Sequence, residues 1–104
     1  MKILLPTQYD SVANAVCGHL DVTRDEIESD LQTIRIATAR RLTWYLLKTL
    51  TGCNLSEIAR HTGNVPSAIS IGVSGICDLI ATDAKFAQAV SVIESRCKLI
   101  LEAK

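Results

Sequence analysis

The side chains in this sequence that could do chemistry are mostly cationic, and they are concentrated in one segment. Residues 35–61 contain five strong bases and one acid, Glu57, a net charge of +4 in a chain whose 11 bases and 11 acids cancel. The bases are Arg35, Arg40, Arg41, Lys48 and Arg60. Five of the 11 acids lie in residues 21–30, against Arg24 alone. One-sided charge of this kind is what contact with phosphate groups needs, and an ordinary solvated helix face is the alternative explanation.

Small polar side chains follow the cationic segment directly. Asn64, Ser67 and Ser70 can hydrogen-bond to the edges of nucleic-acid bases, and each can instead act as a helix cap or a small helix residue. His61, just before them, is either a phosphate or base contact or an exposed residue of a turn. These four are the candidate base or turn contacts, beside the five candidate phosphate contacts.

The sequence offers little for catalysis or metal binding. It contains no phosphate-binding loop of the form G-x-x-x-x-G-K-[ST], no Ser-His-Asp ordering and only two histidines. Its cysteines are Cys17, Cys53, Cys77 and Cys97. Their spacings fit no zinc finger or redox pair, which predicts reduced, mostly buried thiols. We therefore predict a protein that is not an enzyme and has no cofactor and no metal site.

Length and composition favour one globular domain spanning residues 1–104. The chain is 48% hydrophobic and 21% charged, which is typical of a folded domain and excludes a disordered or histone-like tail. No apolar run reaches the roughly 18 residues that a membrane helix needs. The apolar residues 3–5 are too few for a secretory signal. We expect a cytoplasmic protein without a membrane partner.

Apolar residues recur every three or four positions along the chain, and no segment alternates as a strand would. The sequence therefore predicts an all-α fold of about six helices. The expected spans are 7–20, a short helix after residue 23, 33–50, 55–62, 66 to about 80, and 82 or 83 to about 101. The expected end signals are capping boxes at Thr23–Glu26 and Asn54–Glu57, glycine stops at Gly52 and Gly63, a cap at Asn64, and Thr82 or Asp83 as the cap of the last helix.

Two pairs of residues bear on how the predicted helices pack. Trp44 and Tyr45 lie in the apolar band of the longest helix, and we expect them to anchor the core rather than to stack on a base. Gly72 and Gly75 each cost their helix about 1 kcal/mol in propensity relative to alanine. We expect these glycines to allow close approach of another backbone.

The predicted fourth and fifth helices are joined by a turn of three or four residues that contains Gly63. That is the turn length of a helix-turn-helix, in which the first helix braces the second and the second enters the major groove of DNA by its N-terminal residues. The candidate phosphate contacts lie within and before this unit, and two of the four candidate base or turn contacts, Ser67 and Ser70, lie at the start of its second helix. The arrangement favours binding of duplex DNA.

The order of elements resembles the C-terminal DNA-binding domain of DnaA, the bacterial replication initiator, over roughly residues 8–101. The matching segments are Val12-Ala13, Asp25 with Ile27 and Glu28, residues 39–46 (ARRLTWYL), residues 50–60 (LTGCNLSEIAR) and Thr82-Asp83. The resemblance implies a Trp-repressor-like helix-turn-helix bundle, standing free of the family's ATPase module. It also implies a DNA-binding role in replication initiation or transcription regulation.

The turn departs from the family's pattern. Where the family reads Gly-Gly-Arg-Asp-His-Thr-Thr-Val, this sequence has residues 63–69 (GNVPSAI), one residue fewer. Val65, Pro66 and Ala68 replace the family's base-reading side chains, Asn64 replaces an arginine, and Ser67 keeps a hydroxyl. The resemblance implies that Arg40 corresponds to a phosphate-contacting arginine. It also implies that Arg35 lies within one position of the arm that enters the minor groove.

Two functions are compatible with these observations. The first is weakly specific binding of double-stranded DNA by a nucleoid-associated protein, with phosphates held by the five cations and bases met at the turn and the fifth helix. The second is an interaction module that keeps the fold without base readout and binds a protein, or a second copy of itself, through the fifth helix. Val65 and Ile71 motivate the second, since exposed apolar residues suit a protein partner better than DNA.

Overall fold

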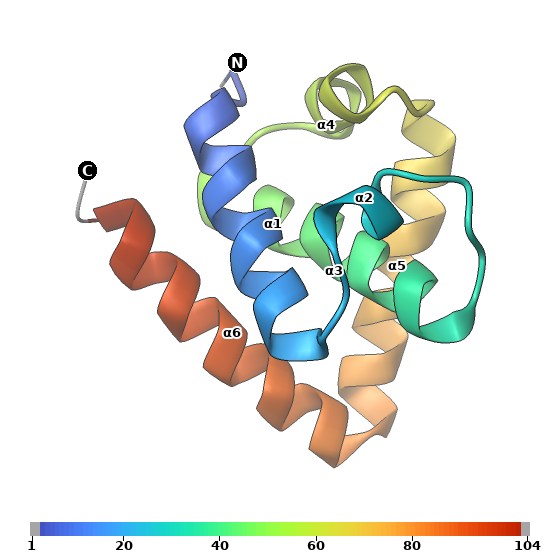
Figure 1. The fold of residues 1–104 in the computed structure, drawn as a ribbon, viewed down its shortest axis with the longest axis vertical. Helices are drawn as coiled ribbons and strands as arrows, with labels where there is room; N and C mark the ends of the chain where they lie inside the picture. The colour runs from blue at the N-terminus through green and yellow to red at the C-terminus, as the bar shows by residue number, and fades with distance from the viewer. Residues whose placement is uncertain (1–2, 103–104) are drawn as a thin grey trace.

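In the computed structural model, residues 3–102 are described, and they fold into six helices without a strand (Figure 1). The helices are α1 (Pro6–Leu20), α2 (Arg24–Ile27), α3 (Ile34–Thr51), α4 (Leu55–Thr62), α5 (Pro66–Thr82) and α6 (Ala84–Glu102). The all-α fold predicted from the sequence is confirmed, and the helices lie close to the expected spans.

α3 is the central helix of the bundle. It contacts α1, α2, α4 and α5, and α6 closes the other side by packing on α1 and α5 (Figure 1). Leu42, Leu46 and Leu47 of α3 are fully buried. Neighbours on several sides explain why the apolar band of this helix is wider than a single stripe.

Several predicted helix ends are confirmed. The Thr23 hydroxyl accepts from the Glu26 N–H (3.1 Å), and the Glu26 carboxylate accepts from the Thr23 N–H (2.9 Å), so α2 opens with a complete capping box. Gly52 and Gly63 both have a φ of 74°, the left-handed conformation that ends a helix. At the start of α6, the Asp83 carboxylate accepts from the Phe86 N–H (3.1 Å), which makes Asp83 the cap there.

Two other predicted caps are wrong in part. Asn54 does cap α4, since its side-chain oxygen accepts from the Glu57 N–H (2.9 Å), but the Glu57 carboxylate turns away and accepts from the Leu4 N–H (3.4 Å). α5 begins after Val65, not after Asn64. The Asn64 amide instead donates to the hydroxyl (2.9 Å) and the carbonyl (3.3 Å) of Thr62. A proline at the first position of α5 has no N–H, which lowers the need for a side-chain cap.

The α3–α5 contact depends on one glycine. Trp44 is buried in the core, as predicted, and Tyr45 is half-buried. A Cβ at Gly72 would lie 2.7 Å from the Trp44 ring, whereas a Cβ at Gly75 would meet nothing within 4 Å. The predicted close approach therefore occurs at Gly72 but not at Gly75. It is made by an aromatic side chain and not by another backbone.

The cysteines are free thiols, and three of the four are buried, as expected. Cys17, Cys53 and Cys97 lie in the core, and Cys77 is exposed on α5. Burial raises the pKa of the Cys97 thiol to about 11 and also raises the pKa of Cys17.

Candidate nucleic-acid interface

The turn between α4 and α5 has the geometry of a helix-turn-helix. α4 ends at Gly63 in the left-handed conformation, and the extended Val65 leads into Pro66 at the start of α5. The two helices are bent by 110° across this break, within the range of about 90–120° typical of the motif. The first residues of α5, Pro66 and Ser67, are exposed. The predicted motif is therefore present, with its second helix starting at the surface.

The outward face of α5 carries the two predicted serines. Ser67, Ser70, Ile71 and Ser74 are all exposed, and their spacing of three and four residues places them on one side of the helix. The opposite side holds the buried Ile69, Gly72 and Ile76. We call the four exposed residues the outer face of α5.

The two candidate contacts at the turn differ in their surroundings. Asn64 is exposed, and its amide binds Thr62 at the end of α4. His61 is half-buried, because its ring packs against the Tyr9 ring of α1, with 4.7 Å between ring centroids and an angle of 46°. His61 thus joins α4 to α1 and has only part of its surface open to a ligand.

The candidate phosphate contacts do not form one uniform surface. Arg35, Arg41 and Lys48 are exposed on α3, and Arg60 is exposed on α4, where it forms an ion pair with Glu57. Arg41 lies against α5, since a Cβ at Gly72 would come within 3.0 Å of the Arg41 side chain. Arg41, Ile71 and Asn64 line one groove of about 300 Å³, which Arg40 and the acid Asp30 line as well. Of these two arginines, Arg41 is the exposed one, and it lies next to Ile71 on the outer face of α5.

Arg40 differs from Arg41 because its guanidinium is bonded to the connection between α2 and α3. Its guanidinium Nε donates to the carbonyl of Ile27 (2.8 Å), and Nη2 donates to the carbonyls of Leu31 (2.8 Å), Ser29 (2.9 Å) and, more weakly, Glu26 (3.3 Å). These carbonyls belong to the last turn of α2 and the loop after it, where the regular pattern of intrahelical hydrogen bonds ends. The Glu26 carbonyl also accepts from the N–H (3.2 Å) and the hydroxyl (2.6 Å) of Ser29. Burial, together with the charge of Arg41, lowers the pKa of Arg40.

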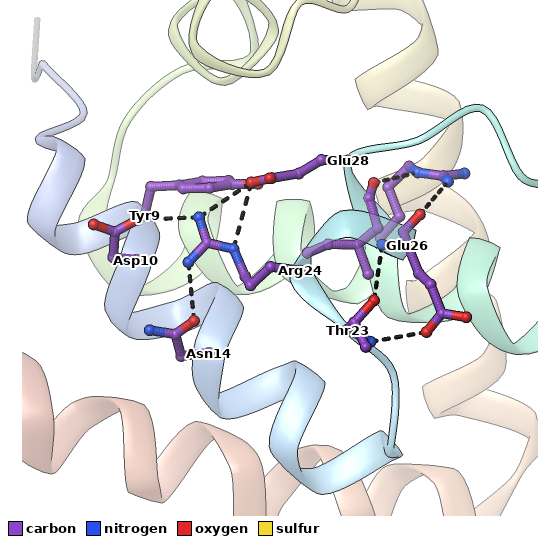
Figure 2. Close-up of polar contacts among 9 residues, drawn as sticks. Tyr9, Asp10, Asn14, Thr23, Arg24, Glu26 and Glu28 are labelled. Atoms are coloured by element: carbon purple, nitrogen blue, oxygen red, sulfur yellow. Dashed lines mark hydrogen bonds and ion pairs between the residues drawn. The ribbon is translucent and has the colours of Figure 1, made fainter.

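A polar cluster on α1 and α2 was missed by sequence reasoning. Arg24 reaches from α2 to α1 and donates to Asp10 (3.1 Å), Asn14 (2.9 Å) and Glu28 (3.1 Å), and it lies over the Tyr9 ring, 5.0 Å from its centroid (Figure 2). The Tyr9 hydroxyl donates to Glu28 (2.9 Å), and burial together with this bond raises the pKa of Tyr9. The (i, i+4) spacing of Arg24 and Glu28 was the one readable signal.

A pocket of about 480 Å³ lies between this cluster and the helix-turn-helix. Its walls include Asp10, Glu28 and Asp30 as well as Arg24 and Arg40. Because these three acids outnumber the two arginines, the pocket does not favour a phosphate group. The groove beside Ile71 has the opposite balance, with Arg40 and Arg41 against Asp30.

Within residues 3–102, no three His, Cys, Asp or Glu side chains come together closely enough to hold a metal ion. No single helix among residues 3–102 is both long and apolar enough to cross a membrane. Taken together as one bent pair, α4 and α5 have the length and composition of a membrane-crossing segment, by those two criteria alone.

Comparison with known proteins places the helix-turn-helix in a family. A family model described as "Bacterial dnaA protein helix-turn-helix" matches residues 9–73. The chain is 30% identical over 95 residues to the chromosomal replication initiator protein DnaA of Xanthobacter autotrophicus, which covers 90% of this chain and 18% of that protein. It is 29% identical over 86 residues to the DnaA protein of Aliarcobacter butzleri (82% and 20%), and 26% identical over 88 residues to that of Campylobacter jejuni subsp. doylei (84% and 20%).

The chain thus spans about a fifth of the length of the curated relatives that it matches. The matched region runs from Tyr9 in α1 to Val73 in α5 and so includes α4, the turn and the first part of α5. Since the family model covers more than half of the chain, the protein belongs to the bacterial DnaA helix-turn-helix family.

Proposed function

We propose that this protein binds duplex DNA through α5 and the cations of α3. The observation that carries the proposal is the position of Arg41, an exposed cation at the edge of a groove that it shares with Ile71 on the outer face of α5. A helix that enters the major groove needs cations at its flank, because phosphates line both rims of that groove. Membership of a helix-turn-helix family supports the same function.

The proposed contacts fall into two groups. The phosphate contacts are Arg35, Arg40, Arg41, Lys48 and Arg60, and the contacts to bases or at the turn are His61, Asn64, Ser67 and Ser70. Arg40 would use Nη1, since its other nitrogens hold backbone carbonyls. Arg60 would either leave its ion pair with Glu57 to bind a phosphate or bind both groups at once. Phosphate contacts position a protein on DNA without reading sequence, so we expect weak specificity.

Binding at several salt concentrations tests this proposal. We would titrate a labelled duplex pool of random sequence and follow fluorescence anisotropy. The affinity should fall with salt with a log–log slope of about −4 if four or five phosphates are neutralised. A slope near zero, or no binding at low salt, would contradict the proposal.

Two double variants locate the binding surface. Arg41→Ala with Lys48→Ala removes two exposed cations of α3, and Lys85→Ala with Arg96→Ala removes two exposed cations of α6. Both variants change the net charge equally. The α3 variant should make the log–log salt slope shallower by about 2, since it removes two phosphate contacts. The α6 variant should leave the slope unchanged. Equal effects of both variants would show that only net charge matters.

The biological setting belongs to the same proposal. The relatives are named as chromosomal replication initiators. We propose that this chain acts on chromosomal DNA, in replication initiation or transcription regulation, and is found in the cytoplasm at the nucleoid.

A second candidate function is favoured by one observation. Ile71 is 72% exposed and Val65 is 60% exposed, both near the start of α5. Exposed apolar side chains of this kind can bind a protein or a second copy of the chain. Sedimentation of the wild type and of Ile71→Lys tests this function, which predicts an assembly in the wild type that the variant loses. A monomer in both cases would exclude self-association.

A further inference from the structure

The outer face of α5 has an unusual chemistry for a helix that enters the major groove. Residues 63–77 contain no charged side chain, and the first charge after the turn is Asp78. The exposed groups over the first turns of α5 are the hydroxyls of Ser67, Ser70 and Ser74 and the apolar side chain of Ile71. Contact with a base edge through this face must therefore use hydroxyl or hydrocarbon groups.

Each base pair presents different partners to such a face. Guanine is read most often by arginine or lysine at O6 and N7, and cytosine by an acid at its amino group, and neither residue type is present here. Serine hydroxyls accept and donate, so they discriminate little. In unmodified DNA, the 5-methyl group of thymine is the apolar group on the major-groove edges of the bases.

We propose that Ile71 contacts thymine methyl groups and thereby gives the protein a preference for thymine-containing sites without any guanine contact. This inference rests on the proposed function, because it requires α5 to lie in the major groove. Ile71 lies in the second turn of α5, on the same face as Ser67 and Ser70. Residues in this part of a recognition helix contact base edges.

The surroundings of Ile71 support this assignment. Ile71 shares its groove with Arg41, so a phosphate held by Arg41 would bring the adjoining base edges toward the isoleucine. At 72% exposed, Ile71 is among the most exposed large apolar residues of the described chain. Ala68, one turn earlier and half-buried, lines the same groove and adds no polar group.

The test compares two pools of duplexes that differ only in methyl groups. One is a random pool of A·T pairs, and the other is its counterpart with deoxyuridine in place of every thymidine. Uracil keeps the charge and the hydrogen-bonding groups of thymine and lacks only the 5-methyl. Competition by anisotropy at fixed salt gives the ratio of affinities. We expect the thymine pool to bind about fourfold more tightly for each methyl group buried, the factor that corresponds to one buried methylene.

Two variants assign the effect to Ile71. Ile71→Ala shortens the exposed side chain and favours helix formation, so the variant should fold. It should bind both pools equally while it keeps the salt slope of the wild type. Leu99→Ala is the matched control, because Leu99 is 71% exposed on α6. This control should retain the preference for thymine.

The outcomes separate the inference from the function on which it rests. Equal affinity of the wild type for both pools, with the steep salt dependence retained, overturns the methyl contact and leaves DNA binding in place. A preference for thymine that survives in Ile71→Ala overturns the role of Ile71. Absence of salt-dependent binding to either pool overturns the proposed function and the inference together.

Discussion

At the scale of single residues, the direction of a side chain matters more here than its charge. Arg40 and Arg41 are neighbours of the same type, and the sequence assigned both to phosphate contact. In the structure, Arg41 is exposed beside α5, whereas Arg40 donates hydrogen bonds to backbone carbonyls at the end of α2 and in the loop after it. The sequence could not separate them, because backbone carbonyls are the same at every residue and the loop that presents them forms only in the folded chain.

Arg40→Lys should lower the free energy of unfolding by about 2–4 kcal/mol. A lysine ammonium is a compact charge and cannot reproduce the planar fork of donors that reaches several carbonyls, and hydrogen bonds from charged groups contribute about 1.5–3 kcal/mol each. Arg41→Lys is the matched control and should change stability by less than about 0.5 kcal/mol, as exposed substitutions usually do. Urea denaturation measures both values, and equal stability of the two variants would refute the role of Arg40.

The thiols should react in a fixed order. The thiolate is the nucleophilic form, Cys77 is exposed, and Cys17, Cys53 and Cys97 are buried. At neutral pH, alkylation of the native protein should therefore modify Cys77 first, and the other three should react only as fast as the protein opens. Mass spectrometry of digested samples over time tests this order, which early modification of Cys97 would contradict.

At the scale of elements, the ends of the helices were the most predictable part of the fold. Glycine stops and the Thr23–Glu26 capping box depend on residues that are close in sequence, so pattern alone found them. The second box was only half correct, because Glu57 binds the Leu4 N–H, which is 53 positions away. Long-range partners of this kind leave no local signal. For the same reason the α1–α2 cluster around Arg24 was not predicted.

The two glycines of α5 should respond in opposite ways to alanine. Gly72→Ala places a Cβ 2.7 Å from the Trp44 ring, and overpacking of this kind costs about 1–3 kcal/mol. A gain in helix propensity of about 1 kcal/mol offsets part of that cost. Gly75→Ala meets nothing within 4 Å and receives the propensity gain alone.

Thermal or urea unfolding of the two glycine variants measures this difference. We expect Gly75→Ala to be more stable than the wild type and Gly72→Ala to be less stable. A stabilised Gly72→Ala would mean that Trp44 can move aside and that the α3–α5 contact is looser than described.

At the scale of the whole molecule, the two signs of charge have different surroundings. Arg24 joins α1 and α2 by binding two of the acids, Asp10 and Glu28 (Figure 2). On α3, Arg35, Arg41 and Lys48 are exposed. The charge count alone predicted a one-sided distribution. It could not show that Arg40 is committed to the loop after α2 or that Arg60 pairs with Glu57.

Low pH should reduce the free energy of unfolding, in part through protonation of Glu57. The hydrogen bond from Arg60 lowers the pKa of Glu57 below its ordinary value. A group with a lowered pKa in the folded state stabilises that state above its unfolded pKa, about 4.3 for glutamate, and this contribution is lost as the pH falls through the folded value.

Comparison with Glu57→Gln isolates this contribution. The variant should be less stable than the wild type at neutral pH, and the two unfolding free energies should converge as the pH falls below about 4.3. Urea denaturation from pH 7 to pH 3 gives both curves. Curves that stay parallel over this range would show that the ionised Glu57 carboxylate does not stabilise the fold.

The Trp44–Gly72 contact gives the protein a built-in optical reporter. Trp44 is the only tryptophan in the chain, it is 7% exposed, and its ring lies directly against the backbone of the helix that we propose enters DNA. Its emission is therefore that of a shielded indole whose surroundings are set by the seating of α5 on α3. A shift of α5 during binding would change the wavelength or intensity of that emission, so unlabelled protein could reveal whether the recognition helix docks as a rigid body or adjusts its position.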